Sequence, residues 1–374
     1  MPPANAPLPD AERVAWLRLI RTENVGPITF RALVHRYGSA QAALDELPTL
    51  ARAGGRARSL RVPSVADAER EIEALAKIGG RTIALADPDY PRLLAASEGA
   101  PPVLSTLGRP ALLTDRAIAI VGARNASGAG RKFGRELAGE LGRLGFLIVS
   151  GMARGMDAAA HEGALPTGTA AVMAGGVDIV YPRENATLYG SIRDTGVVVS
   201  EQPLGLNPTA RHFPIRNRVV SGLALGVVVV EASLRSGSLI TARLAGEQGR
   251  EVMAVPGSPL DPRTRGANKL LREGAALIEE AADVVAALGS LPGRLAESAG
   301  ASSPLPAPGK PLESMVENAR SQVLERLSPV PLAVDEIIRQ CHLSPPVVAL
   351  VLLELELAGR IERHPGNRIA AVTA

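Results

Sequence analysis

Residues 117–130, Ala-Ile-Ala-Ile-Val-Gly-Ala-Arg-Asn-Ala-Ser-Gly-Ala-Gly, carry the sequence pattern that decides the fold. The first five are apolar and uncharged, which predicts a buried β-strand at Ala117–Val121. Gly122 and the small residues after it predict a tight turn that leads into a helix. A strand, a glycine-rich turn and a helix in this order begin a parallel α/β unit.

The same pattern recurs further along the chain. The other apolar runs that precede glycine and small polar residues are Phe146–Val149, Ala170–Met173, Val197–Ser200, Val227–Glu231, Glu251–Val255 and Ala276–Ile278. Buried strands that alternate with helices predict a doubly wound, mostly parallel sheet, an extended Rossmann-like α/β fold, over residues 106–289. Right-handed crossovers then place the carboxyl ends of the strands at one edge, where ligands normally bind.

Residues 10–105 have a helical pattern and form a separate predicted domain. Trp16–Ile20 opens an amphipathic helix, residues 24–27 (Asn-Val-Gly-Pro) make a turn, and a second helix follows through Phe30–Tyr37. Short helices joined by a Val-Gly-Pro turn resemble SAM-like or helix-hairpin-helix modules. Such modules contact either the DNA backbone or another protein, and the sequence leaves both roles open.

The sequence after the predicted sheet divides into a linker and a small domain. Residues 290–313 are rich in Pro, Gly, Ser and Ala, which predicts a flexible linker. Residues 314–374 carry three helical segments and a hairpin, an arrangement that resembles a winged helix, whose third helix is the DNA-recognition helix. That helix carries Glu354 and Glu356 but no Lys or Arg, so we expect this domain to make a protein contact or a weak DNA contact.

Composition excludes several functional classes. The single cysteine, Cys341, excludes an internal disulfide and a thiolate zinc site, and the five histidines show no ligand spacing, so we expect no metal and no cofactor. The amino terminus does not resemble a signal peptide, and the longest uncharged apolar stretch, Val219–Val230, is too short to span a membrane. We therefore expect a soluble cytoplasmic protein. The formal net charge of +3, nearly all from arginine, permits a nucleic acid partner.

Phosphate-binding features gather at the predicted carboxyl edge of the sheet. Residues 122–124 (Gly-Ala-Arg) replace the Gly-x-Gly of a dinucleotide fingerprint, and residues 150–151 (Ser-Gly) replace the acidic residue that binds ribose. A helix amino terminus with free N–H groups beside an arginine still favours phosphate. Several such loops in a row suit a polyanion strand better than one nucleotide. The glycines that we expect to shape these loops are Gly122, Gly151, Gly155, Gly175, Gly176 and Gly237.

Five of these motifs, taken in order, resemble the DprA/Smf family of DNA-processing proteins. They are Ile-Val-Gly-Ala-Arg at 120–124, Ser-Gly-Met-Ala-Arg-Gly-Met-Asp-Ala-Ala-Ala-His at 150–161, Gly-Gly-Val-Asp-Ile-Val-Tyr-Pro at 175–182, Phe-Pro-Ile-Arg-Asn-Arg at 213–218 and Ser-Gly-Ser-Leu-Ile-Thr-Ala at 236–242. The two flanking domains also fit, so the resemblance spans nearly the whole chain. It implies a homodimeric protein that binds single-stranded DNA without catalysis, protects incoming strands and loads the RecA recombinase in natural transformation.

The resemblance also implies which residues contact DNA. The arginine positions of the family map onto Arg124, Arg183, Arg216 and Arg218. The resemblance implies secondary DNA contacts at Ser127, Asn185, Ser236 and Ser238. The aromatic residues near these motifs are only Phe133, Tyr181 and Phe213, so we expect binding to depend mainly on phosphate contacts.

Two other functions fit parts of the pattern. A nucleotide phosphoribohydrolase of the lysine-decarboxylase-like (LOG) type has a related Rossmann core, but residues 236–242 lack its Pro-Gly-Gly-x-Gly-Thr loop and following Glu. A duplex-reading regulator would use the winged helix, which its two glutamates disfavour. Asp157 and His161 lie one helical turn apart, but no nucleophile stands beside them. We expect Asp157 to cap or stiffen a loop and His161 to pack.

Overall fold

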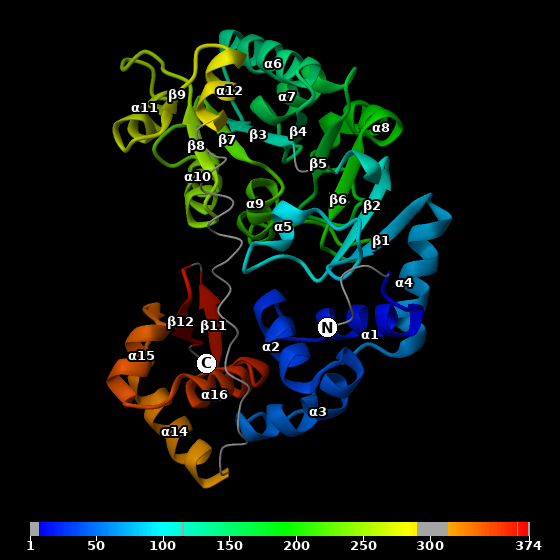
Figure 1. Cartoon of the computed structure of the whole chain (residues 1–374), viewed down its shortest axis with the longest axis vertical. Helices are drawn as coiled ribbons and strands as arrows, with labels where there is room; N and C mark the ends of the chain where they lie inside the picture. Colours follow the sequence, from blue (N-terminus) through cyan, green and yellow to red (C-terminus); the bar gives the residue numbers. More distant parts are fainter. Residues whose placement is uncertain (1–6, 114–115, 290–312, 365, 373–374) are drawn as a thin grey trace. The chain divides into compact units, whose positions relative to one another are not determined.

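The computed structural model describes residues 7–113, 116–289, 313–364 and 366–372. They form two compact units (Figure 1). The sheet unit comprises the described residues between 70 and 289, and the end unit comprises residues 8–69 with the described residues between 313 and 372. The expected linker, residues 290–313, lies outside the described residues except for its last position.

A nine-stranded sheet is the core of the sheet unit, with the strand order β1-β2-β6-β5-β4-β3-β7-β8-β9. The strands are β1 Gly80–Ala84, β2 Val103–Gly108, β3 Ala117–Gly122, β4 Leu147–Ser150, β5 Thr169–Val172, β6 Val197–Ser200, β7 Gly226–Val230, β8 Glu251–Ala254 and β9 Ala276–Leu277. Strands β3 to β9 pair in parallel. The predicted strands and the mostly parallel α/β fold are therefore confirmed.

Strands β1 and β2 correct the expectation that residues 10–105 are helical. They pair with each other and β2 pairs with β6, in both cases antiparallel, so they extend one side of the sheet. Only Ile83 and Ala84 of β1 are buried. The apolar run of β2 is interrupted by Ser105 and Thr106, both buried. Neither segment therefore has the uncharged apolar run by which the other strands were predicted.

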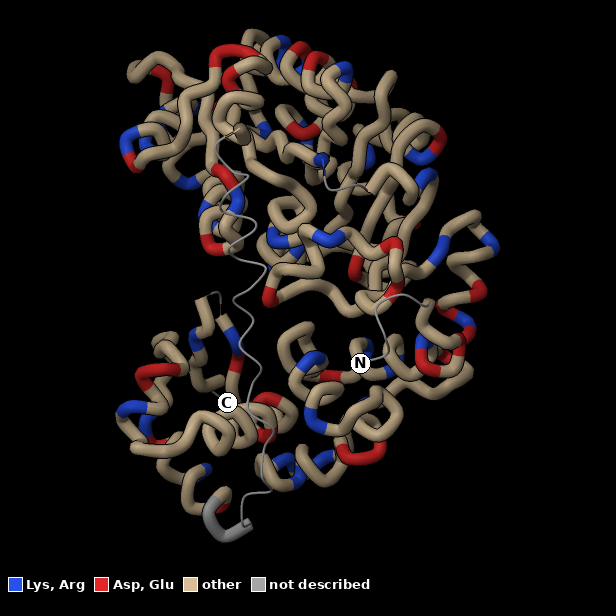
Figure 2. Tube along the Cα trace, in the orientation of Figure 1, with Lys and Arg blue, Asp and Glu red and all other residues tan. Residues whose placement is uncertain are grey.

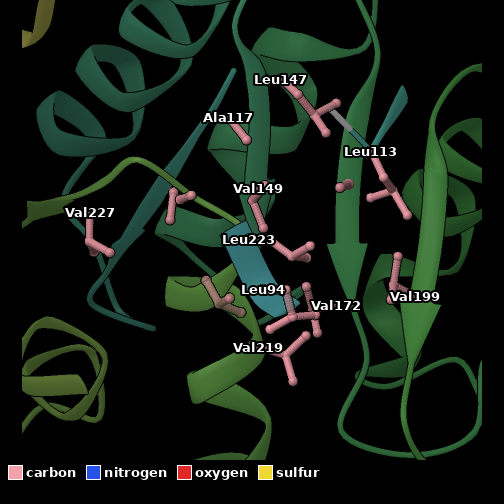
Figure 3. Packing of buried hydrophobic residues seen from close by; sticks show 14 of the residues in the cluster. Leu94, Leu113, Ala117, Leu147, Val149, Val172, Val199, Val219, Leu223 and Val227 are labelled. Carbon is pink, nitrogen blue, oxygen red and sulfur yellow. The ribbon is translucent and has the colours of Figure 1, made fainter. Parts of the chain in front are cut away.

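Helices cover both faces of the sheet because successive strand residues point to opposite sides. On one face, the buried side chains of β3 to β7 pack with α9 (His212–Gly222), α10 (Ser238–Glu247) and the short α5 (Arg92–Ala95). Figure 3 shows this cluster, in which Leu223, just after α9, lies beside Val149 of β4. Helices α9 and α10 contribute residues to the site described below.

The opposite face is covered by a second set of helices. Ile118 and Ile148, one position along from the residues of the first cluster, pack with α6 (Gly128–Arg143), α7 (Met156–Ala164) and α12 (Ala281–Gly289). The remaining helices of the unit are α8 Ala186–Thr195, α11 Arg265–Arg272 and the part of α4 (Val65–Lys77) from Arg70 onward. The sheet is thus buried on both faces, as expected for a doubly wound fold.

The end unit combines helices from both ends of the chain. Its helices are α1 Asp10–Ile20, α2 Pro27–Tyr37, α3 Ala40–Ala53, α14 Glu313–Arg326, α15 Val334–Cys341 and α16 Pro345–Leu357. Its sheet has the order β10-β12-β11, with β10 Leu332–Ala333, β11 Ile361–His364 and β12 Arg368–Ala371. The predicted helical N-terminal module and the predicted three helices with a hairpin are both confirmed.

No single helix among the described residues is long and apolar enough to cross a membrane. α15 and α16 reach the necessary length and apolarity only together, and the pair is bent by 117°.

Candidate anion-binding pocket at the carboxyl edge of the sheet

A pocket of about 680 Å³ lies at the carboxyl edge of the sheet, and we call it the switch-point pocket. Its lining comes from the loops after β3, β4 and β7, from α7, α9 and α10, from the segment before α9, and from Tyr181. Strand β3 lies between β4 and β7, where the strand order reverses. Doubly wound sheets bind ligands in the crevice at this reversal. The structure therefore places a pocket at the edge that the sequence predicted.

The switch-point pocket carries net positive charge. Its lining contains Arg124, Arg216 and Arg235, against the single acid Asp157. Elsewhere, basic and acidic residues are interspersed along the helices (Figure 2). Arg235 was not among the predicted site residues, although it directly precedes the Ser-Gly-Ser motif. An anionic ligand is what such a lining favours.

Arg124 takes part in a stack with two aromatic rings. Arg124 is exposed, and its Cζ lies 5.2 Å from the ring centroid of Phe213. The rings of Phe213 and Tyr181 lie 5.5 Å apart, tilted by 49°, and Tyr181 is 46% exposed. Arginine planes and aromatic faces are the surfaces on which unpaired nucleic acid bases stack. The pocket thus offers stacking surfaces as well as charge.

Arg216 lies beneath the pocket surface, with 6% exposure. Its Nη1 donates to the carbonyl oxygens of Gly151 and, at 2.6 Å, of Val172. Residue 151 must be glycine because a Cβ there would overlap the guanidinium group. Burial lowers the pKa of Arg216 to about 10, so it stays charged at neutral pH, and its Nε has no acceptor among the described residues. A buried cation of this kind favours an anion in the pocket.

Asp157 and His161 are buried on α7 below the pocket. Asp157 accepts a hydrogen bond from the N–H of Ala153 at 3.2 Å, and burial raises the pKa of its carboxyl against the opposing effect of Arg216. The hydroxyl of Thr169 donates its one proton to the carbonyl oxygen of Ile148. Nδ1 of His161, 2.8 Å from that hydroxyl oxygen, is therefore the donor in the hydrogen bond between His161 and Thr169. Burial lowers the pKa of His161 to about 3, which keeps the ring neutral. Loop stiffening by Asp157 and packing by His161 are what the structure shows.

A carboxylate of the chain itself occupies the amino terminus of α6. Ser127 caps this helix, and its Oγ accepts from the N–H of Gly130 at 2.9 Å. Glu231, which follows β7, accepts from the N–H of Ser127 at 2.8 Å and from its hydroxyl at 2.5 Å. We expected free N–H groups for phosphate at this helix end. Glu231 instead takes the place of the anion, and Ser127 does not line the pocket.

Three more predicted residues also lie outside the pocket lining. Arg218 forms an ion pair with Glu201 and donates to the carbonyl oxygen of Gly99, so it ties α9 to the segment before β2. Asn185 donates to the carbonyl oxygen of Met152 at 2.9 Å. Arg183 is exposed at the start of a short 3-10 helix, Arg183–Asn185.

The structure thus brings together half of the predicted contact residues. Those that line the pocket are Arg124, Arg216, Ser236 and Ser238, with the loop glycines Gly122, Gly151 and Gly237. The glycines that do not line it are Gly155, Gly175 and Gly176. Among the described residues, no group of three or more His, Cys, Asp or Glu side chains is placed to hold a metal ion.

Three family models match the chain in order along its sequence. They are the DprA-like N-terminal HHH domain at residues 10–74, DNA recombination-mediator protein A at residues 81–289, and the DprA winged helix domain at residues 303–367. The second model alone covers more than half of the chain and contains the whole switch-point pocket.

Full-length relatives and solved structures agree with these models. Protein Smf of Synechocystis sp. is 30% identical over 96% of this chain and 98% of its own length. A putative DNA processing protein DprA of Mycobacterium tuberculosis is 38% identical over 94% of this chain and 93% of its own length. The X-ray structure of DprA from Streptococcus pneumoniae matches 75% of this chain and 98% of its own, at 30% identity and a TM-score of 0.62.

A second solved relative comes from Helicobacter pylori. It is a DNA processing protein A described for its single-stranded DNA binding mode, and it matches 56% of this chain and 96% of its own, at 30% identity and a TM-score of 0.52. With the three family models and the near full-length relatives, these matches show that the chain belongs to the DprA/Smf family of DNA-processing proteins.

Proposed function

We propose that the switch-point pocket binds single-stranded DNA and that the protein processes DNA by binding, without catalysis. The observation that carries this proposal is a lining that combines three arginines with two stacked aromatic rings. Guanidinium groups bind phosphate oxygens in pairs, and aromatic faces accept unpaired bases. A duplex keeps its bases stacked inside and offers no face to Tyr181 or Phe213. The lining therefore favours a single strand.

Phosphate contacts are available on two sides of the pocket. Arg124 and Arg235 are exposed and free to turn toward the strand. The amino terminus of α10, a helix of ten residues, has Gly237 as its N-cap and no side-chain cap hydrogen bond. The N–H groups of its first three residues already donate, from Ser238 to Oγ of Ser236 at 3.4 Å, from Leu239 to the carbonyl oxygen of Ser236 at 3.2 Å and from Ile240 to that of Gly237 at 3.1 Å. This helix end therefore offers phosphate the partial positive charge of the helix.

The chemistry of the lining favours binding over catalysis. The lining contains no His, Cys, Lys or Glu, and its one carboxyl group, that of Asp157, has no hydrogen bond to a lining hydroxyl among the described residues. The hydroxyls of Ser236 and Ser238 hydrogen-bond to each other at 2.7 Å. The carboxyl of Asp157 accepts a backbone N–H beneath the surface. We therefore do not assign nucleotide hydrolysis to this pocket.

The proposed cellular role follows from the family. The matching family is described as a recombination mediator, and the Helicobacter relative is described for single-stranded DNA binding. We propose that this protein, as a homodimer, protects incoming single strands and passes them to the RecA recombinase in natural transformation. Oligomer size and RecA loading each need a direct assay with the purified chain.

Fluorescence anisotropy of labelled oligo-dT over a salt series, with a duplex of equal length as the control, tests the pocket's role. Salt-sensitive binding that prefers the single strand is the expected result. Equal affinity for both, or no binding at low salt, would refute the proposal. Release of free base from a nucleoside monophosphate would replace it with nucleotide hydrolysis.

A further inference from the structure

Helix α16 is apolar over most of its circumference. From Val347 to Leu357 its sequence is Val-Val-Ala-Leu-Val-Leu-Leu-Glu-Leu-Glu-Leu, and nine of the thirteen residues of the helix are buried. One face suffices to pack a helix on its own small domain, whereas an apolar surface this wide calls for packing against more than one neighbour. α16 therefore needs a partner beyond the C-terminal domain.

That partner is the N-terminal helical module of the same chain. The end of α3 comes so close to α16 that a Cβ on Gly54 would lie 2.6 Å from the carbonyl carbon of Glu354 and 2.9 Å from Cβ of Ala358. Glu354 is 5% exposed, and Arg320 of α14 donates two hydrogen bonds to it, at 2.7 and 3.1 Å. Only glycine permits this approach of the two backbones.

The turn between α1 and α2 meets the other end of α16. Nδ2 of Asn24 donates to the carbonyl oxygen of Leu357, the last residue of α16, at 3.3 Å. A Cβ on Gly359 would lie 3.0 Å from the same Nδ2. This turn, residues 24–27, leads into the second helix of the segment that matches the DprA-like N-terminal HHH domain, a type of module that contacts either the DNA backbone or another protein.

We propose that the two terminal domains occlude each other's DNA-reading elements, so that neither binds duplex DNA. α16 has the position of a recognition helix and packs on α3, while the turn of the N-terminal module is bonded to the end of α16. This inference concerns the end unit alone and stands whether or not the switch-point pocket binds DNA.

The charges of α16 agree with a protein partner. Glu354 is paired with Arg320, and Glu356 is paired with Arg363 at 2.7 Å. The helix itself has no Lys or Arg. A phosphate-lined groove would have to accept two carboxylates in exchange for these ion pairs, which is unfavourable.

The substitution Gly54→Ala tests the contact by the sign of its effect. Gly54 has a φ of −69°, which alanine adopts without strain. If nothing lay close to residue 54, the only effect of alanine would be to restrict the unfolded chain. The equilibrium constant for unfolding would then become about two- to fivefold smaller. Against α16, the added methyl group overlaps backbone atoms, and we expect the constant to rise about tenfold or more. Trp16, the chain's only tryptophan and buried in α1, reports urea unfolding of the end unit by fluorescence.

Gly26→Ala is the matched control. Gly26 has a φ of −91°, and a Cβ there would meet nothing within 4 Å. Its unfolding constant is expected to stay within about fivefold of the wild type, because alanine is a poorer N-cap than glycine but also restricts the unfolded chain, and these two effects oppose each other. A Gly54→Ala chain that is more stable than the wild type, or equal effects of the two substitutions, would overturn the proposed contact.

Hydrogen exchange of the full chain tests the occlusion itself. The peptides of interest cover residues 24–28 and 350–358. Both are expected to exchange slowly, to be unaffected by added random-sequence duplex DNA, and to exchange faster together in Gly54→Ala. Protection of either peptide by the duplex would show that a DNA-reading element is available, and would overturn the proposal.

Discussion

At the scale of single residues, the proposed affinity for single-stranded DNA has two sources, phosphate contacts by arginine and base stacking on aromatic rings. Arg124→Ala removes one exposed guanidinium group from the pocket. Each phosphate contact to a single strand contributes about 0.7 to the slope of log K against log salt concentration. We expect weaker oligo-dT binding and a slope that is shallower by about 0.7, measured by anisotropy.

Arg193→Ala is the control for that loss of charge. Arg193 is exposed on α8, does not line the pocket, and pairs with Asp194 at 3.4 Å. Its removal changes the net charge equally, so its slope should match the wild type. If the Arg124→Ala slope also matched, Arg124 would make no phosphate contact.

Phe213→Leu removes the ring of the stack and keeps an apolar side chain. Base stacking on an aromatic ring contributes about 1–3 kcal/mol, so the dissociation constant for oligo-dT should rise by about 5- to 150-fold. The salt slope should not change, because no charge is lost. A slope that falls together with the affinity would instead make Phe213 a positioning residue for Arg124, whose guanidinium lies over its ring.

Some residue-scale features of the site could not be predicted from the sequence. Arg216 was recognised as a basic motif residue, but its burial was not foreseen, because arginine is usually exposed. Its acceptors lie 65 and 44 positions away along the chain. Glu231 likewise reaches Ser127 across 104 positions. Such contacts follow only from the complete fold.

At the scale of elements, α7 carries a buried histidine that makes stability depend on pH. Burial lowers the pKa of His161 from 6.5 to about 3, while the unfolded chain keeps the ordinary value. Between these two values only the unfolded state binds the proton. The free energy of unfolding therefore falls as the pH is lowered through this window, by up to about 1.4 kcal/mol per pH unit. Asp157 has the opposite effect, because its pKa is raised in the folded state.

The substitution His161→Gln isolates the contribution of the histidine. It removes the titrating ring, keeps a side-chain amide near Thr169, and leaves Asp157 in place. Urea unfolding followed by far-ultraviolet circular dichroism should show the wild type losing stability relative to the variant as the pH falls from about 6.5. Parallel pH profiles of the two proteins would mean that burial does not lower the pKa of His161.

Elements with a strong sequence pattern were predictable, and elements without one were not. Strands β3 to β9 are short apolar runs before small residues, which is how buried parallel strands read. β1 and β2 lack such runs and were not predicted. The glutamates of α16 already favoured a protein contact for the C-terminal domain, and the identity of that protein surface, α3 of the same chain, required the structure.

At the scale of the whole molecule, both ends of the chain build one unit and the middle builds the other. The switch-point pocket belongs wholly to the sheet unit. The DNA-reading elements of the end unit are covered by contacts within that unit. Single-stranded DNA contact is therefore expected in the sheet unit alone.

Hydrogen exchange with bound oligo-dT gives the footprint that follows from this division. We expect slower exchange in the loops at residues 122–127 and 233–241, which line or adjoin the pocket, and no change at residues 24–28 and 350–358. In Arg124→Ala the protection should weaken at the same oligonucleotide concentration, because binding is weaker. Protection at residues 24–28 would extend the strand path to the N-terminal module. Protection there without any in the pocket loops would move the binding site off the sheet altogether.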